Sequence, residues 1–248
     1  MTAPLRIVAV YPDLLGTYGD GGNGLILARR AQWRGMEVVL TQDPSDVPLP
    51  DADIYCLGGG EDGPQVRAAR SLIEDGVLGR RVAQGAVVLA VCAGYQIVGQ
   101  QFPGADGVLH EGVGLLDIAT AKGTGPRAVG EVVAEVTGAT LPALTGFENH
   151  GGTTTLAPGA VPLAQVTKGI GNGDGSGTEG AVAGHVVGTY LHGPLLARNP
   201  ALADLLLRWA LDADTLAPLD DGAEDALRYE RFAAAGPARR RLSSRRQK

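Results

Sequence analysis

Residues 88–99, VLAVCAGYQIVG, decide the fold. A run of apolar residues, typical of a buried strand, stops at Cys92 and is followed by Ala93 and Gly94. Small residues here allow a tight strand-to-helix turn that lifts the cysteine sulfur out of the sheet. The helix expected from Tyr95 onward directs free N–H groups and a positive dipole end at the sulfur, which favours the thiolate. The pattern predicts a reactive Cys92 and places the Ala93 N–H near a developing oxyanion.

On both sides of this segment, strand patterns alternate with helix patterns. Such an alternation predicts an α/β fold, in which a mostly parallel sheet carries helices on both faces. In the first half we expect strands at 5–11, 36–42, 51–60 and 86–92, and helices at 24–35 and within 64–85. The second half is richer in strand patterns, at 114–121, 130–137, 145–152 and 181–193, with helices at 199–212 and 224–236.

Two of these strands end in motifs that suit a binding site. The third expected strand runs into the glycines Gly58, Gly59 and Gly60, and the fourth runs into Cys92. Ligands of open α/β sheets bind at the carboxyl ends of the strands. The glycine run and the cysteine are therefore expected to lie on one rim of the sheet.

Composition excludes several classes of protein. The chain has 248 residues, 44% of them hydrophobic, which is enough for a sizeable core. It has two cysteines, too few for a secreted disulfide scaffold, and no pattern of a signal peptide or membrane span, so we expect a cytoplasmic protein. Neither a zinc nor a calcium pattern is present, so no metal site is expected.

Charge is divided unevenly along the chain. The last thirteen residues carry six basic and no acidic residues, whereas the remainder carries 15 basic and 27 acidic residues. An acidic body does not favour nucleic acid. We expect one domain over residues 1–236, with a core at about 5–212, and a basic, disordered tail at 237–248. The glycine-rich segment 168–180 is expected to be a mobile loop.

A thiolate needs a proton shuttle, and the chain offers four histidines. His192 follows a strand pattern and precedes Gly–Pro, and His150 also lies where a strand meets a loop. His185 is expected within a strand, and His110 has no evident partner. The pattern alone leaves His192 and His150 open as the base.

The motifs together resemble a known family. CAGYQ (92–96) is similar to the nucleophile elbow of class I glutamine amidotransferases, and the glycine run resembles their oxyanion loop. YGDGGN (18–23), FENHGG (147–152) and GTYLHGPLLARNP (188–200) narrow the resemblance to the CobB/CobQ-like branch, and there to the glutaminase subunits of lipid II isoglutaminyl synthases. The resemblance covers about residues 5–212 and implies a flavodoxin-like class I amidotransferase domain.

This resemblance implies a role for each site residue. Cys92 attacks the glutamine amide and His192 transfers the proton, while the N–H groups of Gly59 and Ala93 hold the oxyanion, with Gly60 in place of Gly59 as the fallback. Gln96 helps to position the substrate. Arg127, in GTGPRAVGE (123–131), corresponds to an arginine that binds glutamine in the family, and a guanidinium suits an α-carboxylate.

The resemblance also implies a partner. The ammonia goes to a Mur-ligase-like synthetase subunit of the MurT type in a heterodimer, which uses ATP and Mg²⁺ to amidate the D-glutamate α-carboxyl of the lipid II stem peptide. This chain has no G-x-x-x-x-G-K-[ST] motif and needs no cofactor of its own.

One position departs from the general class I pattern. Most class I amidotransferases carry glutamate two residues after the histidine, where this chain has Pro194. The orienting group is then a backbone carbonyl or an acid from elsewhere, and a partner subunit is one source. YGDGGN is either a ligand or partner site, or a turn capped by Asp20.

Three other functions remain as alternatives. The first is a glutaminase for another amidation, such as that of cobyrinate. The second is a thiol hydrolase similar to DJ-1 or PfpI, which also holds a cysteine on an elbow. The third is a non-catalytic binding subunit with the same fold. The presence of both Cys92 and His192 argues against the third.

Overall fold

The structure is a computed structural model and describes residues 3–236. A six-stranded sheet lies at its centre, in the order β13-β14-β4-β3-β1-β2, and all neighbouring pairs are parallel except β13 with β14. This confirms the predicted α/β class. The strands are β1 (Leu5–Val10), β2 (Val38–Asp43), β3 (Ile54–Leu57), β4 (Val87–Val91), β13 (Ala181–Ala183) and β14 (Val186–Thr189).

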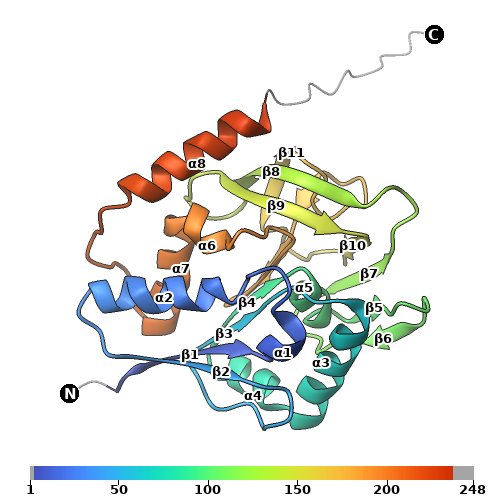
Figure 1. Ribbon diagram of the computed structural model, residues 1–248, viewed down its shortest axis with the longest axis horizontal. Helices are drawn as coiled ribbons and strands as arrows, with labels where there is room; N and C mark the ends of the chain where they lie inside the picture. The colour runs from blue at the N-terminus through green and yellow to red at the C-terminus, as the bar shows by residue number, and fades with distance from the viewer. Residues whose placement is uncertain (1–2, 237–248) are drawn as a thin grey trace.

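Helices cover both faces of this sheet (Figure 1). α2 and α7 lie on one face, whereas α3 and α4 lie on the other. β3 and β4 are buried along their whole length, as expected of strands covered on both sides. The helices are α1 (Pro12–Leu15), α2 (Gly22–Trp33), α3 (Asp62–Asp75), α4 (Val77–Ala83), α5 (Ala93–Ile97), α6 (Leu195–Arg198), α7 (Pro200–Leu211) and α8 (Gly222–Ala235).

The β-rich second half forms two further sheets of four strands each. One has the order β10-β7-β5-β6 and the other β12-β11-β8-β9, and α8 packs against β8 and β9. Their strands are β5 (Gln101–Pro103), β6 (Leu109–Glu111), β7 (Ile118–Lys122), β8 (Ala128–Val136), β9 (Leu144–His150), β10 (Gly152–Leu156), β11 (Ala164–Lys168) and β12 (Thr178–Glu179). Within residues 3–236, no helix combines the length and the apolar character that a membrane crossing needs.

One local expectation was wrong, and another was incomplete. His185 lies in the turn between β13 and β14, not within a strand, and stacks on Trp209. The segment 168–180, expected to be a mobile loop, is bonded to the fold near both ends: Glu148 accepts hydrogen bonds from the N–H groups of Ile170 and Gly171, and the Asn172 side chain bonds to Gly180 through both its oxygen and its nitrogen. A polar, glycine-rich composition predicted mobility, but it did not reveal these partners. The predicted tail at 237–248 lies outside the described residues.

A buried arginine joins α2 to the C-terminal part of the chain. Arg30 is 1% exposed and forms a bidentate pair with Asp204 of α7, at 2.8 Å for both bonds. It also binds Asp221, at 2.6 and 3.1 Å, just before α8. Arg34 shares Asp204, at 2.7 and 3.0 Å. Burial opposes the charge on Arg30, but these carboxylates outweigh it and raise the pKa of Arg30.

Arg30→Ala is therefore expected to lower the free energy of unfolding by about 3 kcal/mol, measured by urea denaturation. The value lies at the lower end of the range for a broken buried pair because Arg34 still holds Asp204. Arg29→Ala, on the exposed face of the same helix, is the control and should change stability by less than about 0.5 kcal/mol. Equal losses of unfolding free energy in the two variants would mean that the Arg30 ion pairs make no specific contribution to stability.

Candidate active site

Cys92 stands on a strained turn between β4 and α5. Its backbone has φ 54° and ψ −106°, a conformation that costs energy for any residue with a side chain. Gly94 permits the turn, because a Cβ at this position would lie 2.7 Å from Leu57 Cβ and 3.0 Å from the Leu57 oxygen. The predicted elbow is confirmed as a structure. Cys56, by contrast, lies in the core, and burial raises the pKa of its thiol to about 12.

His192 is held beside this elbow by backbone and side-chain bonds. Its N–H donates to the Phe147 oxygen at 2.9 Å, and its own oxygen accepts from Phe147 N–H at 3.0 Å. Its Nδ1 donates to Asp20 Oδ2 at 2.8 Å, and both side chains are buried. The other ring nitrogen, Nε2, makes no hydrogen bond within the described residues. Nε2 is thus available to a reacting group.

Asp20 is the orienting acid that the sequence pattern failed to identify. It comes from YGDGGN, 172 residues before His192 in the chain. It does not cap α2, whose N-cap is Gly21 and has no side-chain capping bond. The capping interpretation of Asp20 was therefore wrong, and an acid from a partner subunit is not needed to orient His192. The signal in the sequence was an acid in YGDGGN, for which a ligand or partner site had been left open beside the capping role.

The surroundings of His192 favour its charged form. Burial alone would lower its pKa, but the bond to Asp20 and the nearby Cys92 sulfur outweigh it and raise the pKa of His192 to about 10. Because the pKa rises on folding, these contacts stabilise the fold fully below pH about 6.5, and this stabilisation is lost as the pH rises through about 10. At neutral pH the site therefore favours an imidazolium next to Cys92.

In this structure the Gly59 N–H is not free to take the oxyanion role that was expected of it. The Gly59 N–H donates to Asp20 Oδ2 at 3.0 Å, so it is already occupied. Gly59 is needed for packing, since a Cβ there would lie 2.9 Å from His192 Cε1. Gly60 and Ala93 line the pocket beside Cys92, and neither N–H group donates a hydrogen bond among the described residues. The N–H groups of Gly60, the predicted fallback, and of Ala93 are therefore the two expected donors that remain free to bind an oxyanion.

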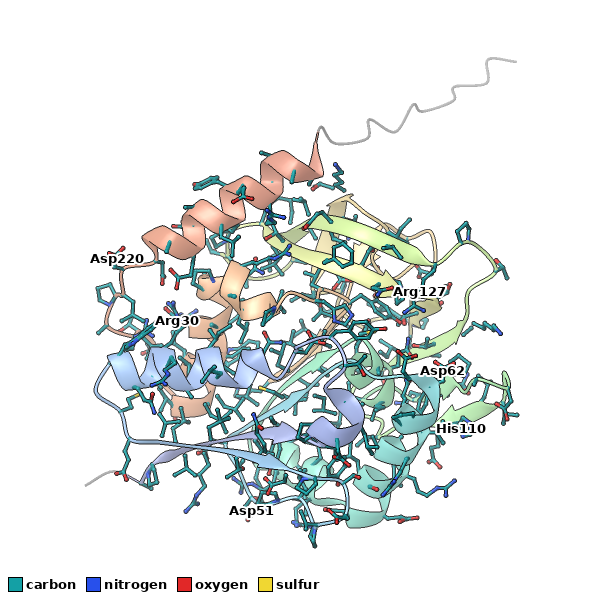
Figure 2. All side chains as sticks on the ribbon, viewed as in Figure 1. Arg30, Asp51, Asp62, His110, Arg127 and Asp220 are labelled. Atoms are coloured by element: carbon teal, nitrogen blue, oxygen red, sulfur yellow. The ribbon has the colours of Figure 1, made fainter. Side chains whose placement is uncertain are left out.

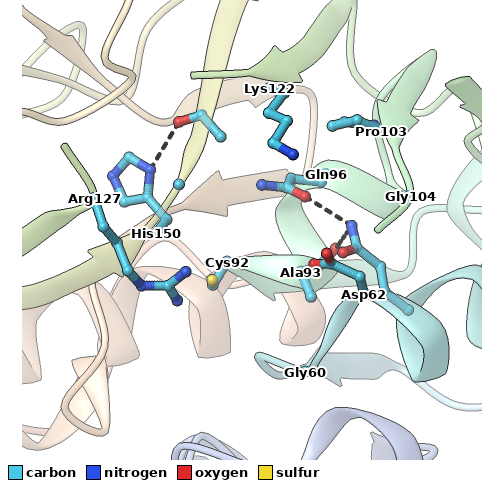
Figure 3. Close-up of a pocket in the computed structure, with 13 residues that line it drawn as sticks. Gly60, Asp62, Cys92, Ala93, Gln96, Pro103, Gly104, Lys122, Arg127 and His150 are labelled. Atoms are coloured by element: carbon cyan, nitrogen blue, oxygen red, sulfur yellow. Dashed lines mark hydrogen bonds between the residues drawn. The ribbon is translucent and has the colours of Figure 1, made fainter. Parts of the chain in front are cut away.

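Cys92 opens into a pocket of ≈ 200 Å³ (Figure 3). This volume suits an amino acid, because clefts for drug-sized ligands begin at about 300 Å³. The predicted site residues Gly60, Ala93, Gln96 and Arg127 lie around Cys92 on its walls, while His192 lies outside the lining. The remaining lining residues are Asp62, Gln65, Pro103, Gly104, Lys122, His150, Gly151 and Gly152.

His150 reaches the pocket but is committed to other contacts. Its ring stacks on Tyr190 with centroids 3.7 Å apart, and its Nδ1 bonds to the Gly152 oxygen at 2.9 Å. Its nearest carboxylate is that of Glu148, at 3.8 Å, which is too long for a good hydrogen bond. His192 combines a carboxylate partner with a free ring nitrogen beside Cys92, so the geometry favours His192 over His150.

Gln96 is held rigidly at the floor of the pocket. Its oxygen accepts from Gln65 Nε2 at 2.8 Å, and its nitrogen donates to the Tyr190 hydroxyl at 3.0 Å. The Tyr190 hydroxyl lies 2.6 Å from that of Thr154, which lies 2.8 Å from that of Thr120. Only one N–H and one lone pair of the Gln96 amide remain for a ligand. Gln65, which the sequence analysis missed, belongs to this support.

Arg127 is oriented by Asn149 of the FENHGG motif. Its Nε donates to Asn149 Oδ1 at 2.6 Å, and its Nη2 donates to the Asn149 oxygen at 2.9 Å. These two bonds fix the guanidinium plane, and Arg127 forms no ion pair within residues 3–236. A fixed guanidinium without a counter-charge on a pocket wall is suited to a carboxylate ligand.

Comparison with known proteins agrees with this geometry. Residues 6–200 match the model of the CobB/CobQ-like glutamine amidotransferase domain. Subunit GatD of the glutamine-hydrolysing lipid II isoglutaminyl synthase of Staphylococcus aureus (strain N315) is 36% identical over 220 residues, which cover 84% of this chain and 85% of the relative. The same subunit of Streptococcus pneumoniae (strain ATCC BAA-255 / R6) is also 36% identical, over 84% of this chain and 80% of the relative.

A solved structure supports the fold independently. A glutamine amidotransferase of Thermotoga maritima superimposes with a TM-score of 0.51 at 16% identity, covering 94% of this chain and 95% of that chain. At this identity the likeness concerns the fold only. The domain match over most of the chain and the two relatives of similar length show that this chain belongs to the family of CobB/CobQ-like glutamine amidotransferases.

Proposed function

We propose that this chain is the glutaminase subunit of a lipid II isoglutaminyl synthase. It hydrolyses L-glutamine and passes the ammonia to a Mur-ligase-like partner, which amidates the D-glutamate α-carboxyl of the lipid II stem peptide. Two relatives that match along most of both chains carry the name of this enzyme. The observation that carries the chemistry is Cys92 on a strained elbow, next to a buried His192–Asp20 pair.

The first half of the reaction forms a thioester. The Cys92 thiolate attacks the amide carbon of glutamine, and the carbonyl electron pair moves onto oxygen. The N–H groups of Ala93 and Gly60 stabilise this oxyanion. The charged His192 gives its Nε2 proton to the amide nitrogen, and the C–N bond breaks to release ammonia. The raised pKa of His192 supports this step, because it supplies the proton at neutral pH.

The second half restores the enzyme. Neutral His192 takes a proton from water, which attacks the thioester carbon, and the C–S bond breaks to leave glutamate and the thiolate. Asp20 holds the Nδ1–H of His192 throughout and stabilises the imidazolium whenever it forms. Asp20 is thus a positioning residue that acts through His192.

Substrate binding uses the charged and polar walls of the pocket. Arg127, held by Asn149, binds the α-carboxylate, and the free face of the Gln96 amide helps to position the side chain of glutamine. These steps need no cofactor in this chain. ATP and Mg²⁺ belong to the partner in this proposal, which places the heterodimer in the cytoplasm, where ATP is available.

Cys92→Ala is expected to abolish glutamine-dependent amidation in the complex with the synthetase subunit, because no thioester forms. Amidation with a high concentration of ammonium chloride should survive, since the synthetase step does not use the thiol. The measurement is isoglutamine formation in lipid II by mass spectrometry. The core variant Cys56→Ala is the control and should keep glutamine-dependent activity. Wild-type glutamine consumption by Cys92→Ala would overturn the nucleophile assignment.

Asp20→Asn is expected to lower kcat for glutamine hydrolysis by up to ~10⁴-fold, because the imidazole loses its orienting charge. The pKa of His192 should fall towards its ordinary value, so the alkaline limb of the kcat/KM profile should move to lower pH. Asp13→Asn removes a nearby carboxylate that bonds to Ser45 and is the control. An unchanged alkaline limb would show that Asp20 does not act through His192.

Arg127→Ala is expected to raise KM for glutamine about 10-fold or more, with little change in kcat, because it removes a contact made equally in ground and transition states. Asn149→Ala should raise KM by less, since Arg127 keeps its charge but loses its fixed orientation. Alkylation of Cys92 by iodoacetamide should be unchanged in both variants. A loss confined to kcat would contradict a role in binding the α-carboxylate.

A further inference from the structure

The pocket holds an acidic side chain to which the proposed steps give no role. Asp62 is the one acidic residue among those that line it, together with the basic residues Lys122 and Arg127. Within residues 3–236, none of these three side chains forms an ion pair. Charges of both signs are therefore uncompensated in the one cavity that contains Cys92.

These charges stand on separate walls of the pocket. Asp62 lies at the N-terminal end of α3 and Arg127 lies just before β8 (Figure 2), and both line the pocket. In the close-up, Arg127 and Asp62 lie on opposite sides of Cys92, and Lys122 lies along another wall (Figure 3). A ligand that lies over Cys92 thus meets positive charge on one side and negative charge on the other.

The helix itself explains why Asp62 faces the pocket. Residues three apart on a helix share a face, and Gln65 of the same turn is buried with its amide on Gln96 at 2.8 Å. The neighbouring Glu61 does not line the pocket and accepts a bond from the Tyr18 hydroxyl at 3.4 Å. Glu148, also near the site, is occupied by two backbone N–H groups. Asp62 is thus the carboxylate available to a ligand.

We propose that Asp62 binds the α-ammonium group of the substrate and restricts the glutaminase to the free amino acid. This inference rests on the proposed glutaminase function and deepens it. Glutamine bound through its side-chain amide at Cys92 carries a carboxylate and an ammonium group on the same α-carbon. With the carboxylate on Arg127, the ammonium group needs an acceptor on the opposite side, and Asp62 supplies a charged one. Glutamine residues in peptides lack the free ammonium group and are rejected.

A purely structural role for Asp62 makes a different prediction. Asp62 is an acidic residue in the first turn of α3, where a negative charge stabilises the helix dipole. In that role its removal lowers stability slightly and affects all substrates alike. Recognition of the ammonium group instead changes the preference between substrates. The ratio of two kcat/KM values separates the two roles.

The experiment compares L-glutamine with 4-carbamoylbutanoate, which has the same amide and carboxylate but no ammonium group. Ammonia release is measured with the chain in complex with its synthetase subunit. In Asp62→Asn, kcat/KM for glutamine is expected to fall about 10- to 100-fold, as for a lost bond to a charged group, whereas kcat/KM for 4-carbamoylbutanoate stays the same. Asp62→Glu should retain part of the preference. Glu74→Gln, on the same helix but away from the pocket, is the matched control for net charge.

A second readout does not depend on turnover. Alkylation of Cys92 is followed by intact mass with 6-diazo-5-oxo-L-norleucine, which carries both α-groups, and with iodoacetamide, which carries neither. Asp62→Asn should slow the first reagent about 10-fold or more and leave the second unchanged. Equal slowing of both reagents, or of neither, would overturn the role of Asp62. A wild-type complex that releases no ammonia from glutamine would overturn the glutaminase function itself, and the role of Asp62 with it.

Discussion

The hydrogen bond between Asp20 and His192 is the contact on which the site depends. It joins the loop between α1 and α2 to the segment after β14, 172 residues apart, and both side chains are buried. The same carboxylate oxygen accepts the Gly59 N–H and so fixes the glycine run that borders the pocket. One buried carboxylate therefore sets the orientation of the imidazole and the course of the glycine run, and against the effect of burial it raises the pKa of His192.

The sequence predicted those features that arise from contacts between near neighbours. Apolar runs and their lengths marked the buried strands, because strands covered on both faces have few polar positions. Small residues after Cys92 marked the elbow, because the turn leaves no space beside Leu57. The position of Cys92 on this turn, with Ala93 next to it, was predicted in this way. His192 was one of two candidates until family resemblance separated it from His150.

The parts that the sequence did not predict are contacts between distant segments. Asp20 with His192, Gln65 with Gln96, and Arg127 with Asn149 are pairs whose spacing follows no helical or strand period. The Gly59 N–H belongs to another such pair, which the glycine run alone did not reveal. A glycine-rich composition also concealed the buried Asn172, so the segment around it was predicted to be mobile. These features depend on tertiary packing, which a local pattern does not encode.

The chain of hydroxyl groups beneath Gln96 constrains how the sequence of this protein can evolve. Tyr190 follows the central sheet, whereas Thr154 and Thr120 belong to β10 and β7 of another sheet, and all three are buried. The Gln96 amide donates to the Tyr190 hydroxyl, which shares a hydrogen bond with the Thr154 hydroxyl, and Thr154 shares another with Thr120. Loss of one hydroxyl leaves each neighbour one hydrogen bond short in the interior, at about 1–3 kcal/mol. These positions are therefore expected to be inherited as a unit, so that the two sheets cannot evolve independently beneath the pocket.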